Sequence, residues 1–243
     1  MKNYEFDKMG GIWVDQARDI TEKGEFVALL GHNGCGKSTV AKHLNAMIVP
    51  DSGKVFIDGD DTADEDKTLD IRKKVGLVLQ NPDNQLVASV VEEDVAFGPE
   101  NLGVEPSEIR QRVDDALKAV GMYEFRKDAP YKLSGGQKQI LNLASIMAMQ
   151  PSVLILDEPT SQLDPIAASE FLHCVSRINH ELGTTVIITE HRLDEVLPLS
   201  DRVLVIENNG ISAFDSPQKV GKILKEKDSK TLCSVTLIFI GIL

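Results

Sequence analysis

A nine-residue stretch decides the fold: Gly31-His32-Asn33-Gly34-Cys35-Gly36-Lys37-Ser38-Thr39, which matches the phosphate-loop pattern G-x-x-x-x-G-K-[ST]. An apolar run at 26–30 precedes it and predicts a buried strand, while the apolar spacing over 37–48 predicts a helix. In this context the loop turns its backbone N–H groups toward phosphate oxygens. We therefore expect nucleotide phosphates here, with Lys37 on the β- and γ-phosphates and Ser38 giving a hydroxyl to Mg²⁺.

Two adjacent carboxylates form a second candidate element. The apolar run 153–156 predicts a buried strand that ends at Asp157 and Glu158. Ligands of α/β sheets bind at the carboxyl ends of the strands. Asp157 is suited to hold Mg²⁺ through water, and Glu158 to orient or polarise a water in line with the γ-phosphate. The plainer alternative is that both are ordinary acids at the end of a strand.

A third element, Leu133-Ser134-Gly135-Gly136-Gln137, lies about twenty residues before Asp157. Ser134 is a candidate N-cap for a helix that continues to Met149, and the two glycines would leave the first helical amides exposed to an anion. The sequence thus predicts a second anion site. One chain does not need two sites for a γ-phosphate.

The remaining pattern predicts an α/β fold with a mostly parallel sheet covered on both faces. Apolar strands are expected at 75–80 and 185–189, helices at 106–121 and 165–182, and a closing hairpin at 202–207 and 211–214 around Asn209-Gly210. A short strand is expected at 54–58. The acidic run 58–66 is expected to be a solvated loop.

Composition excludes several classes of function. The formal net charge of -12 argues against a nucleic-acid partner, because such proteins present basic surfaces to phosphates. The three cysteines, Cys35, Cys174 and Cys233, show neither a disulfide framework nor metal-ligand spacing, which favours a reducing cytoplasm. No signal peptide or run of about 20 apolar residues is present, so we expect a chain that is soluble when alone.

The LSGGQ stretch beside a phosphate loop and Leu156-Asp157-Glu158-Pro159 resembles the signature of the ATP-binding subunits of ABC transporters. The resemblance implies a phosphate-loop ABC ATPase fold over 1–225, in which a helical subdomain at about 82–150 interrupts a mostly parallel core and a small antiparallel β subdomain accompanies it. Residues 226–243 form an atypical apolar tail. The implied ligands are ATP and Mg²⁺.

The same resemblance assigns roles to further residues. Ser134, Gly135, Gly136 and Gln137 would contact the ATP held by a partner subunit. Gln80 would sense Mg²⁺ and the membrane subunit, and 161–164 would form the loop that crosses the dimer interface. His191, which taken alone after a buried strand would more often be a packing histidine, would contact the γ-phosphate. The catalytic set would be Lys37, Glu158 and His191, and the Mg²⁺ set Ser38, Gln80 and Asp157.

Residues 80–85 and 91–98 resemble the energy-coupling factor group, whose ATPases power uptake of vitamins or of cobalt and nickel. The resemblance implies a peripheral motor at the cytoplasmic face of the cell membrane. Its partners would be a second ATPase subunit, alike or paralogous, a transmembrane coupling protein and a substrate-binding membrane protein. The solute cannot be read from this chain, because a separate membrane protein selects it.

Some residues depart from the family pattern. Trp13, and less well Tyr4, are the candidates for an adenine-stacking aromatic residue, and Ile140 stands where the group usually has an arginine. Cys35 replaces the usual serine or alanine. Because Cys35 lies near Lys37 and a helix N-terminus, we expect a reactive thiol that ATP protects. The segment 232–243 is apolar where the group usually carries a dimer-holding extension.

Two rival functions fit parts of this pattern. An ABC-like module could bind ATP and hold partners together with little turnover, and steady ATP hydrolysis would distinguish the motor from it. ABC cassettes also serve in DNA repair and translation. The acidic charge and the absence of a long coiled-coil insertion and of a second cassette argue against that class.

Overall fold

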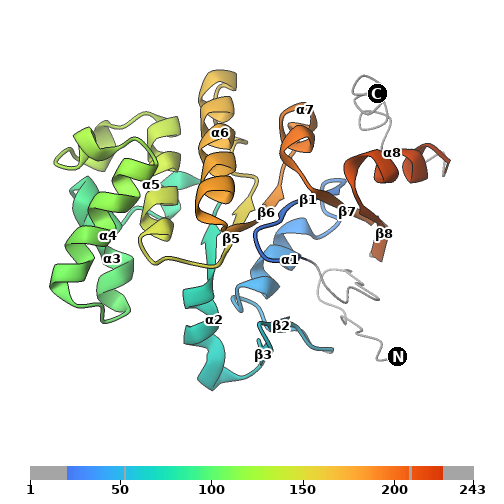
Figure 1. Cartoon of the computed structure of the whole chain (residues 1–243), viewed down its shortest axis with the longest axis horizontal. Helices are drawn as coiled ribbons and strands as arrows, with labels where there is room; N and C mark the ends of the chain where they lie inside the picture. Colours follow the sequence, from blue (N-terminus) through green and yellow to red (C-terminus); the bar gives the residue numbers. More distant parts are fainter. Residues whose placement is uncertain (1–20, 52, 208–209, 227–243) are drawn as a thin grey trace.

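The computed structural model describes residues 21–51, 53–207 and 210–226 (Figure 1). Its main sheet has six strands in the order β4-β5-β6-β1-β7-β8. The strands are β1 Phe26–Gly31, β4 Val75–Val78, β5 Val153–Asp157, β6 Thr185–Thr189, β7 Arg202–Glu207 and β8 Gly210–Asp215. All neighbours in this sheet pair in parallel except β8, which runs antiparallel to β7. The carboxyl ends of the parallel strands therefore meet at one edge, as the sequence predicts for an α/β fold.

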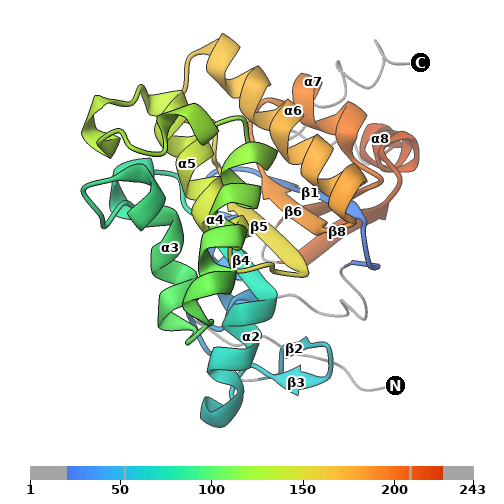
Figure 2. The ribbon, with the colours of Figure 1, turned by 60° about the vertical axis from the view of Figure 1, so that its left-hand side comes forward.

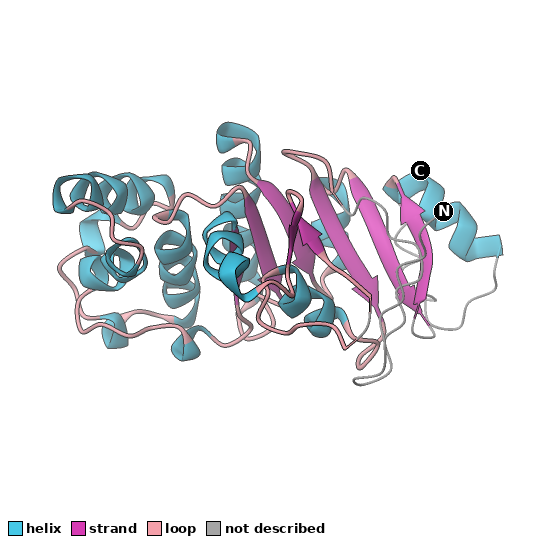
Figure 3. Cartoon of the chain, turned by 90° about the horizontal axis from the view of Figure 1, so that it is seen from below, coloured by secondary structure: helices cyan, strands magenta, loops and turns pink. Residues whose placement is uncertain are grey.

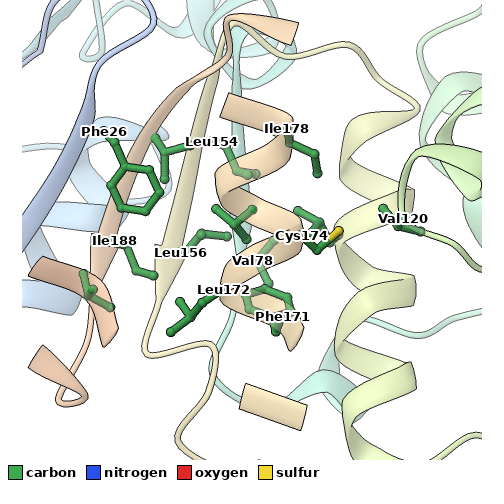
Figure 4. Close-up of a cluster of buried hydrophobic side chains, with 14 of the residues drawn as sticks. Phe26, Val78, Val120, Leu154, Leu156, Phe171, Leu172, Cys174, Ile178 and Ile188 are labelled. Carbon is green, nitrogen blue, oxygen red and sulfur yellow. The ribbon is translucent and has the colours of Figure 1, made fainter. Parts of the chain in front are cut away.

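The strands are apolar throughout because both faces of the sheet are buried. Leu154 and Leu156 of β5 belong to the larger core cluster, whereas Ile155 between them belongs to the cluster on the opposite face. Figure 4 shows the larger cluster, in which Phe171 and Ile178 of α6 (Pro165–Leu182) lie beside the strand side chains. Leu156 is fully buried, so its replacement by alanine should cost about 2–5 kcal/mol.

Helices cover the two faces unequally. The larger cluster includes residues of α5 (Gly135–Met147), α6, α7 (Leu193–Val196) and α8 (Pro217–Glu226), and Figure 2 shows α6 running along this face. The other face is covered by α1 (Lys37–Leu44) and α2 (Thr68–Lys74) through Ala41, Leu44 and Ile71. No helix in the part of the chain that the structure describes is long and apolar enough to cross a membrane.

A group of helices lies at one end of the molecule, away from the sheet's antiparallel edge (Figure 3). It consists of α3 (Val91–Asn101), α4 (Pro106–Ala119) and the adjoining α5, all between β4 and β5 in the chain. The buried Asp94 accepts hydrogen bonds from the Val87 and Ala88 amides and from the Ser145 hydroxyl, which ties the entry of α3 to α5. These helices lie within the range 82–150 of the predicted subdomain, whose exact limits stay a prediction.

The acidic run 58–66 is more ordered than the sequence suggests. Asp60–Asp61 forms strand β3, which pairs antiparallel with β2 (Phe56–Ile57). Asp60 accepts a hydrogen bond from Lys74 Nζ at 2.9 Å and Asp61 from Lys54 Nζ at 2.8 Å, and these bonds lower the pKa of both carboxyls. The expectation of a solvated loop agrees with the exposed residues 58–59 and 63–66 and fails at Asp60 and Asp61, because it considered these acids without the lysines that pair with them.

Element bounds agree with expectation where apolar periodicity is strong. The expected bounds of α6 and β6 are those of the structure. The helix expected over 37–48 ends at Leu44 instead, since Ala46 has a left-handed φ of 52° that breaks the helical path. Short 3₁₀ helices occupy connections at Glu65–Lys67, Pro82–Asn84, Tyr123–Phe125, Pro130–Lys132 and Leu197–Leu199. Trp13, Tyr4, Cys233, Asn209 and the apolar tail lie outside the described residues.

Candidate functional site

The predicted phosphate loop connects β1 to α1 and forms a tight glycine-dependent turn. Gly36 is the N-cap of α1 with a left-handed φ of 101°, and Gly34 has a φ of 79°. A side chain on Gly31 would collide with Cys35 Sγ and would lie 2.6 Å from the Ile206 carbonyl oxygen. No side chain caps α1, so its first amides face the loop, beside the exposed His32, Asn33 and Gly34.

Lys37 lies beneath this loop rather than in solvent. Its side chain is 4% exposed, and Nζ donates hydrogen bonds to the carbonyl oxygens of Gly31 at 3.1 Å and His32 at 3.4 Å. Nζ also lies 3.9 Å from Glu158 Oε1. A buried ammonium group is costly unless it is paired, and this one has the loop carbonyls and one carboxylate as partners. The loop thus holds a fixed positive charge next to the α1 N-terminus.

Asp157 and Ser38 meet at the carboxyl end of β5. Ser38 Oγ donates to Asp157 Oδ1 at 2.9 Å, and Thr189 Oγ1 donates to the same oxygen at 2.9 Å. Asp157 is 6% exposed. A hydroxyl and a carboxylate are hard oxygen ligands of the kind that Mg²⁺ prefers, and Mg²⁺ commonly takes its other ligands from water and substrate phosphate. These two side chains therefore fit a Mg²⁺ ion bound together with a nucleotide.

Glu158 is the point where the other predicted residues converge. His191 Nε2 lies 3.0 Å from Glu158 Oε1, and Gln80 Nε2 donates to Glu158 Oε2 at 3.3 Å. With Lys37 Nζ at 3.9 Å, three predicted residues thus surround one carboxylate: Lys37 from the start of α1, Gln80 from the loop after β4, and His191 from the segment after β6. Glu158 has a left-handed φ of 47°, which is uncommon for a residue with a side chain and is frequent at functional sites.

Buried amides of α5 hold the loop that carries Gln80. Gln139 Nε2 donates to the Leu79 carbonyl oxygen at 3.1 Å, and Asn142 Nδ2 donates to the Pro82 carbonyl oxygen at 3.0 Å. Both side chains are almost completely buried. The loop that carries Gln80 is therefore fixed to the same helix that begins at the LSGGQ stretch.

The LSGGQ stretch begins α5 as predicted. Ser134 Oγ accepts from the Gln137 amide at 3.3 Å, and Gln137 Oε1 accepts from the Ser134 amide at 2.9 Å, which forms a capping box. Gly136 also allows α5 to pack closely against α6, because a Cβ at this position would lie 2.8 Å from Ala167 Cβ. A Cβ on Gly135 would have no neighbour closer than 3.9 Å. The two predicted anion sites lie at the starts of different helices, α1 and α5, which pack on opposite faces of the sheet.

One expectation about a nearby residue changes. Cys35 is 1% exposed and packs among Val27, Leu29 and Ile206, so the accessible, reactive thiol predicted there was wrong. The loop at 161–164 is anchored to the site, because Ser161 Oγ donates to the Glu158 carbonyl oxygen at 2.9 Å. Asp164 caps α6 through the Ile166 and Ala167 amides.

Sequence reasoning missed Glu190. This carboxylate is 3% exposed and accepts hydrogen bonds from Thr160 and from the His191 amide. The available signal was an acid directly after an apolar strand, next to a candidate site residue. The prediction considered only the histidine in Thr189-Glu190-His191-Arg192.

Comparison with known proteins gives a consistent picture. The family profile described as "ABC transporter" matches residues 18–161. "Energy-coupling factor transporter ATP-binding protein EcfA1" of Clostridium perfringens is 55% identical over 186 residues, which are 76% of this chain and 66% of that protein. "Cobalt import ATP-binding protein CbiO" of Syntrophus aciditrophicus is 46% identical over 207 residues, covering 85% of this chain and 73% of the relative. The chain thus spans slightly less than two thirds of the Clostridium perfringens relative.

Solved structures agree in fold. The cbiO1 structure from Clostridium perfringens, described as part of the ABC transporter complex cbiONQ, has a TM-score of 0.81 at 32% identity and covers 97% of each chain. The ATP-binding cassette MJ0796, solved as a post-hydrolysis dimer with ADP and Pi, has a TM-score of 0.73 at 27% identity over 88% of this chain and 96% of that one. This chain belongs to the ABC transporter family, in the group of energy-coupling factor ATP-binding proteins.

Proposed function

We propose that this chain is the ATP-binding and ATP-hydrolysing motor subunit of an energy-coupling factor importer, which powers uptake of a vitamin or a transition-metal ion through membrane partners. The observation that carries the proposal is the convergence of Lys37, Gln80 and His191 on the Glu158 carboxylate. Hydrolysis needs a positioned water beside the γ-phosphate, and this group of side chains has the chemistry to provide it.

ATP would bind with its phosphates in the loop 31–39. The amides at the start of α1, which no side chain caps, and the buried Lys37 ammonium supply the positive potential that phosphates require. When bound, Mg²⁺ would be held by Ser38 and Asp157 with Gln80 nearby, and would neutralise charge on the phosphate oxygens. Glycines at 31, 34 and 36 let the backbone approach the ligand closely.

For hydrolysis, Glu158 would orient the attacking water and His191 would donate a hydrogen bond to the γ-phosphate. A carboxylate accepts hydrogen bonds, so the contact with Glu158 requires the proton on His191 Nε2. A phosphate oxygen can accept from the same donor. His191 is half exposed, which leaves its ring free to exchange one acceptor for the other.

We further propose that two such cassettes, alike or paralogous, enclose two ATP molecules. Each would bind between the loop 31–39 of one subunit and residues 134–137 of the other. The placement of α1 and α5 on opposite faces of the sheet supports this arrangement, since the two anion sites then belong to different faces of one cassette. ATP binding would close the dimer, and hydrolysis would reopen it.

The group to which the chain belongs supports a proposal about its membrane partners. We propose a transmembrane coupling protein and a substrate-binding membrane protein, with this chain peripheral at the cytoplasmic face. The hydrogen bonds from Gln139 and Asn142 to the loop around Gln80 give a physical link through which cassette motion would reach a membrane subunit. The net charge of -12 supports the exclusion of nucleic acid.

The proposal is tested by purifying the chain from mildly solubilised membranes of its source, identifying the proteins that accompany it, and measuring ATP hydrolysis by the complex. An integral coupling protein, a second ATPase and small substrate-binding membrane proteins are the expected companions. A complex that binds ATP but does not turn it over would favour the rival function, a scaffolding ABC-like module. Recovery without any membrane protein would contradict the importer.

A further inference from the structure

Glu190 is a buried carboxylate that the proposed mechanism does not use. Its Oε1 accepts from the Thr160 amide at 2.9 Å and the Thr160 hydroxyl at 2.6 Å, and its Oε2 accepts from the His191 amide at 2.9 Å. In the described part of the chain it has no ion-pair partner. Burying an unpaired carboxylate is expensive even when it is hydrogen-bonded, so a hydrophobic side chain would be the cheaper choice for stability alone.

The two segments joined by Glu190 are those that carry Glu158 and His191. Thr160 lies two residues after Glu158, whose left-handed φ of 47° persists only if the surrounding structure holds it. The Glu158 amide is bonded to Thr189, and the Glu158 carbonyl oxygen to Ser161. Glu190 Oε1 adds the two bonds that hold Thr160 of this turn, and Oε2 fixes the backbone of His191.

We propose that Glu190 is a positioning residue for ATP hydrolysis, which fixes the Glu158 turn and the His191 backbone relative to each other. The inference rests on the proposed function, because it concerns the geometry of that reaction. The hydrogen bonds of Glu190 go to Thr160 and to the His191 amide, not to the Glu158 carboxylate or the His191 ring. Its effect passes through the 3.0 Å contact between Glu158 Oε1 and His191 Nε2. Catalytic groups must be held within a fraction of an ångström of their working positions. Catalysis therefore requires more precise placement than the stability of the fold does.

The decisive experiment is a double-mutant cycle of Glu190→Gln and His191→Ala, with kcat and KM for ATP measured in the assembled complex. A glutamine has one acceptor oxygen where the carboxylate has two, so it must lose the bond to Thr160 or the bond to His191. We expect Glu190→Gln to lower kcat about 10- to 100-fold and to change KM by less than about threefold, since a misplacement of about 1 Å costs up to about 100-fold. Glu195→Gln removes a charge nearby, from the surface pair with Arg192, and is the matched control.

The cycle separates positioning from simple stabilisation. If Glu190 acts through His191, the kcat loss caused by His191→Ala will be much smaller in the Glu190→Gln background than in the wild type. Two results would overturn this inference and leave the proposed function standing. One is that the kcat losses of the two substitutions are additive. The other is that the wild type hydrolyses ATP and the kcat of Glu190→Gln is within about twofold of its value. A wild type without turnover would instead overturn the proposed function. If Glu190→Gln does not fold, Thr160→Val, which removes the hydroxyl at 2.6 Å and keeps the side-chain shape, is expected to lower kcat without raising KM.

Discussion

His191 Nε2 lies 3.0 Å from Glu158 Oε1, although the two residues are 33 positions apart in the chain. The contact exists because β5 and β6 are adjacent parallel strands, with Asp157 opposite Thr189 in the register. Glu158 is the first residue after β5, and His191 is the second residue after β6. Sheet register thus brings a carboxylate and a proton donor to the same edge of the sheet, and the predictions below depend on this edge.

Replacing Lys37 with methionine should weaken ATP binding. Among the described residues, Lys37 is the only lysine or arginine within 4.0 Å of the Glu158 carboxylate, and methionine keeps an unbranched side chain in the buried position. Because hydrogen bonds to charged groups contribute about 1.5–3 kcal/mol, the Kd should rise about 10- to 100-fold. Equilibrium titration with ATP measures it. Lys42→Met at the other end of α1 is the control, and an unchanged Kd for Lys37→Met would remove Lys37 from the phosphate site.

Gly136→Ala should destabilise the fold, and Gly135→Ala should not. The added Cβ would lie 2.8 Å from Ala167 Cβ in the first case and 3.9 Å from the nearest atom, Leu163 Cδ2, in the second. Overpacking between α5 and α6 should cost about 1–3 kcal/mol, whereas alanine at Gly135 favours the helix by up to about 1 kcal/mol. Urea unfolding of both variants measures the difference. Equal midpoints would show that the two helices do not pack this closely.

Thiol labelling should be slow at both described cysteines. Cys35 and Cys174 are buried, at 1% and 8% exposure, so a Cys233→Ser chain should react with an alkylating reagent only after unfolding. The labelled peptide is identified by mass spectrometry with and without urea. Rapid labelling of Cys35 in the folded chain, prevented by ATP, would restore the reactive thiol that the sequence alone suggests.

Cys174 should also make stability fall at alkaline pH. Burial raises the pKa of its thiol above the ordinary value of 9.0, so the folded chain holds this proton more tightly than the unfolded chain. The contribution to stability is therefore complete below pH 9.0 and declines as pH rises toward the folded-state pKa. Below pH 9.0, the unfolding free energies of the wild type and of Cys174→Ala should change with pH in the same way. Above it, the unfolding free energy of the wild type should fall more steeply than that of Cys174→Ala. Parallel profiles at all pH values would contradict this.

Local motifs predict much of this protein because each carries its own physical requirement. The sequence from β1 to α1 needs glycine at 34 and 36 for positive φ, and Ser134 with Gln137 specifies a helix start through reciprocal bonds. Such features can be predicted from the local sequence without knowledge of tertiary contacts. The same holds for β6 and α6, where apolar spacing is continuous and the flanking residues end the element.

Other features depend on contacts between distant residues and could not be predicted. The order of β3 depends on Lys54 and Lys74, and the fixed position of the loop at 79–82 depends on amides 60 residues away in α5. Glu190 is of this kind as well, since its partner Thr160 is 30 positions distant. Burial of Cys35 follows from its packing against β7, which the loop sequence does not reveal.

The central claim is that this edge of the sheet hydrolyses ATP, and the most direct measurement is steady-state ATP hydrolysis by Glu158→Gln beside the wild type in the assembled complex. The account predicts that the substitution lowers kcat by about 100-fold or more while ATP still binds, since the glutamine cannot polarise the water but leaves the phosphate loop intact. Glu170→Gln, at an exposed position of α6, is the control and should hydrolyse ATP like the wild type. A Glu158→Gln complex that hydrolyses ATP at the wild-type rate would contradict the account.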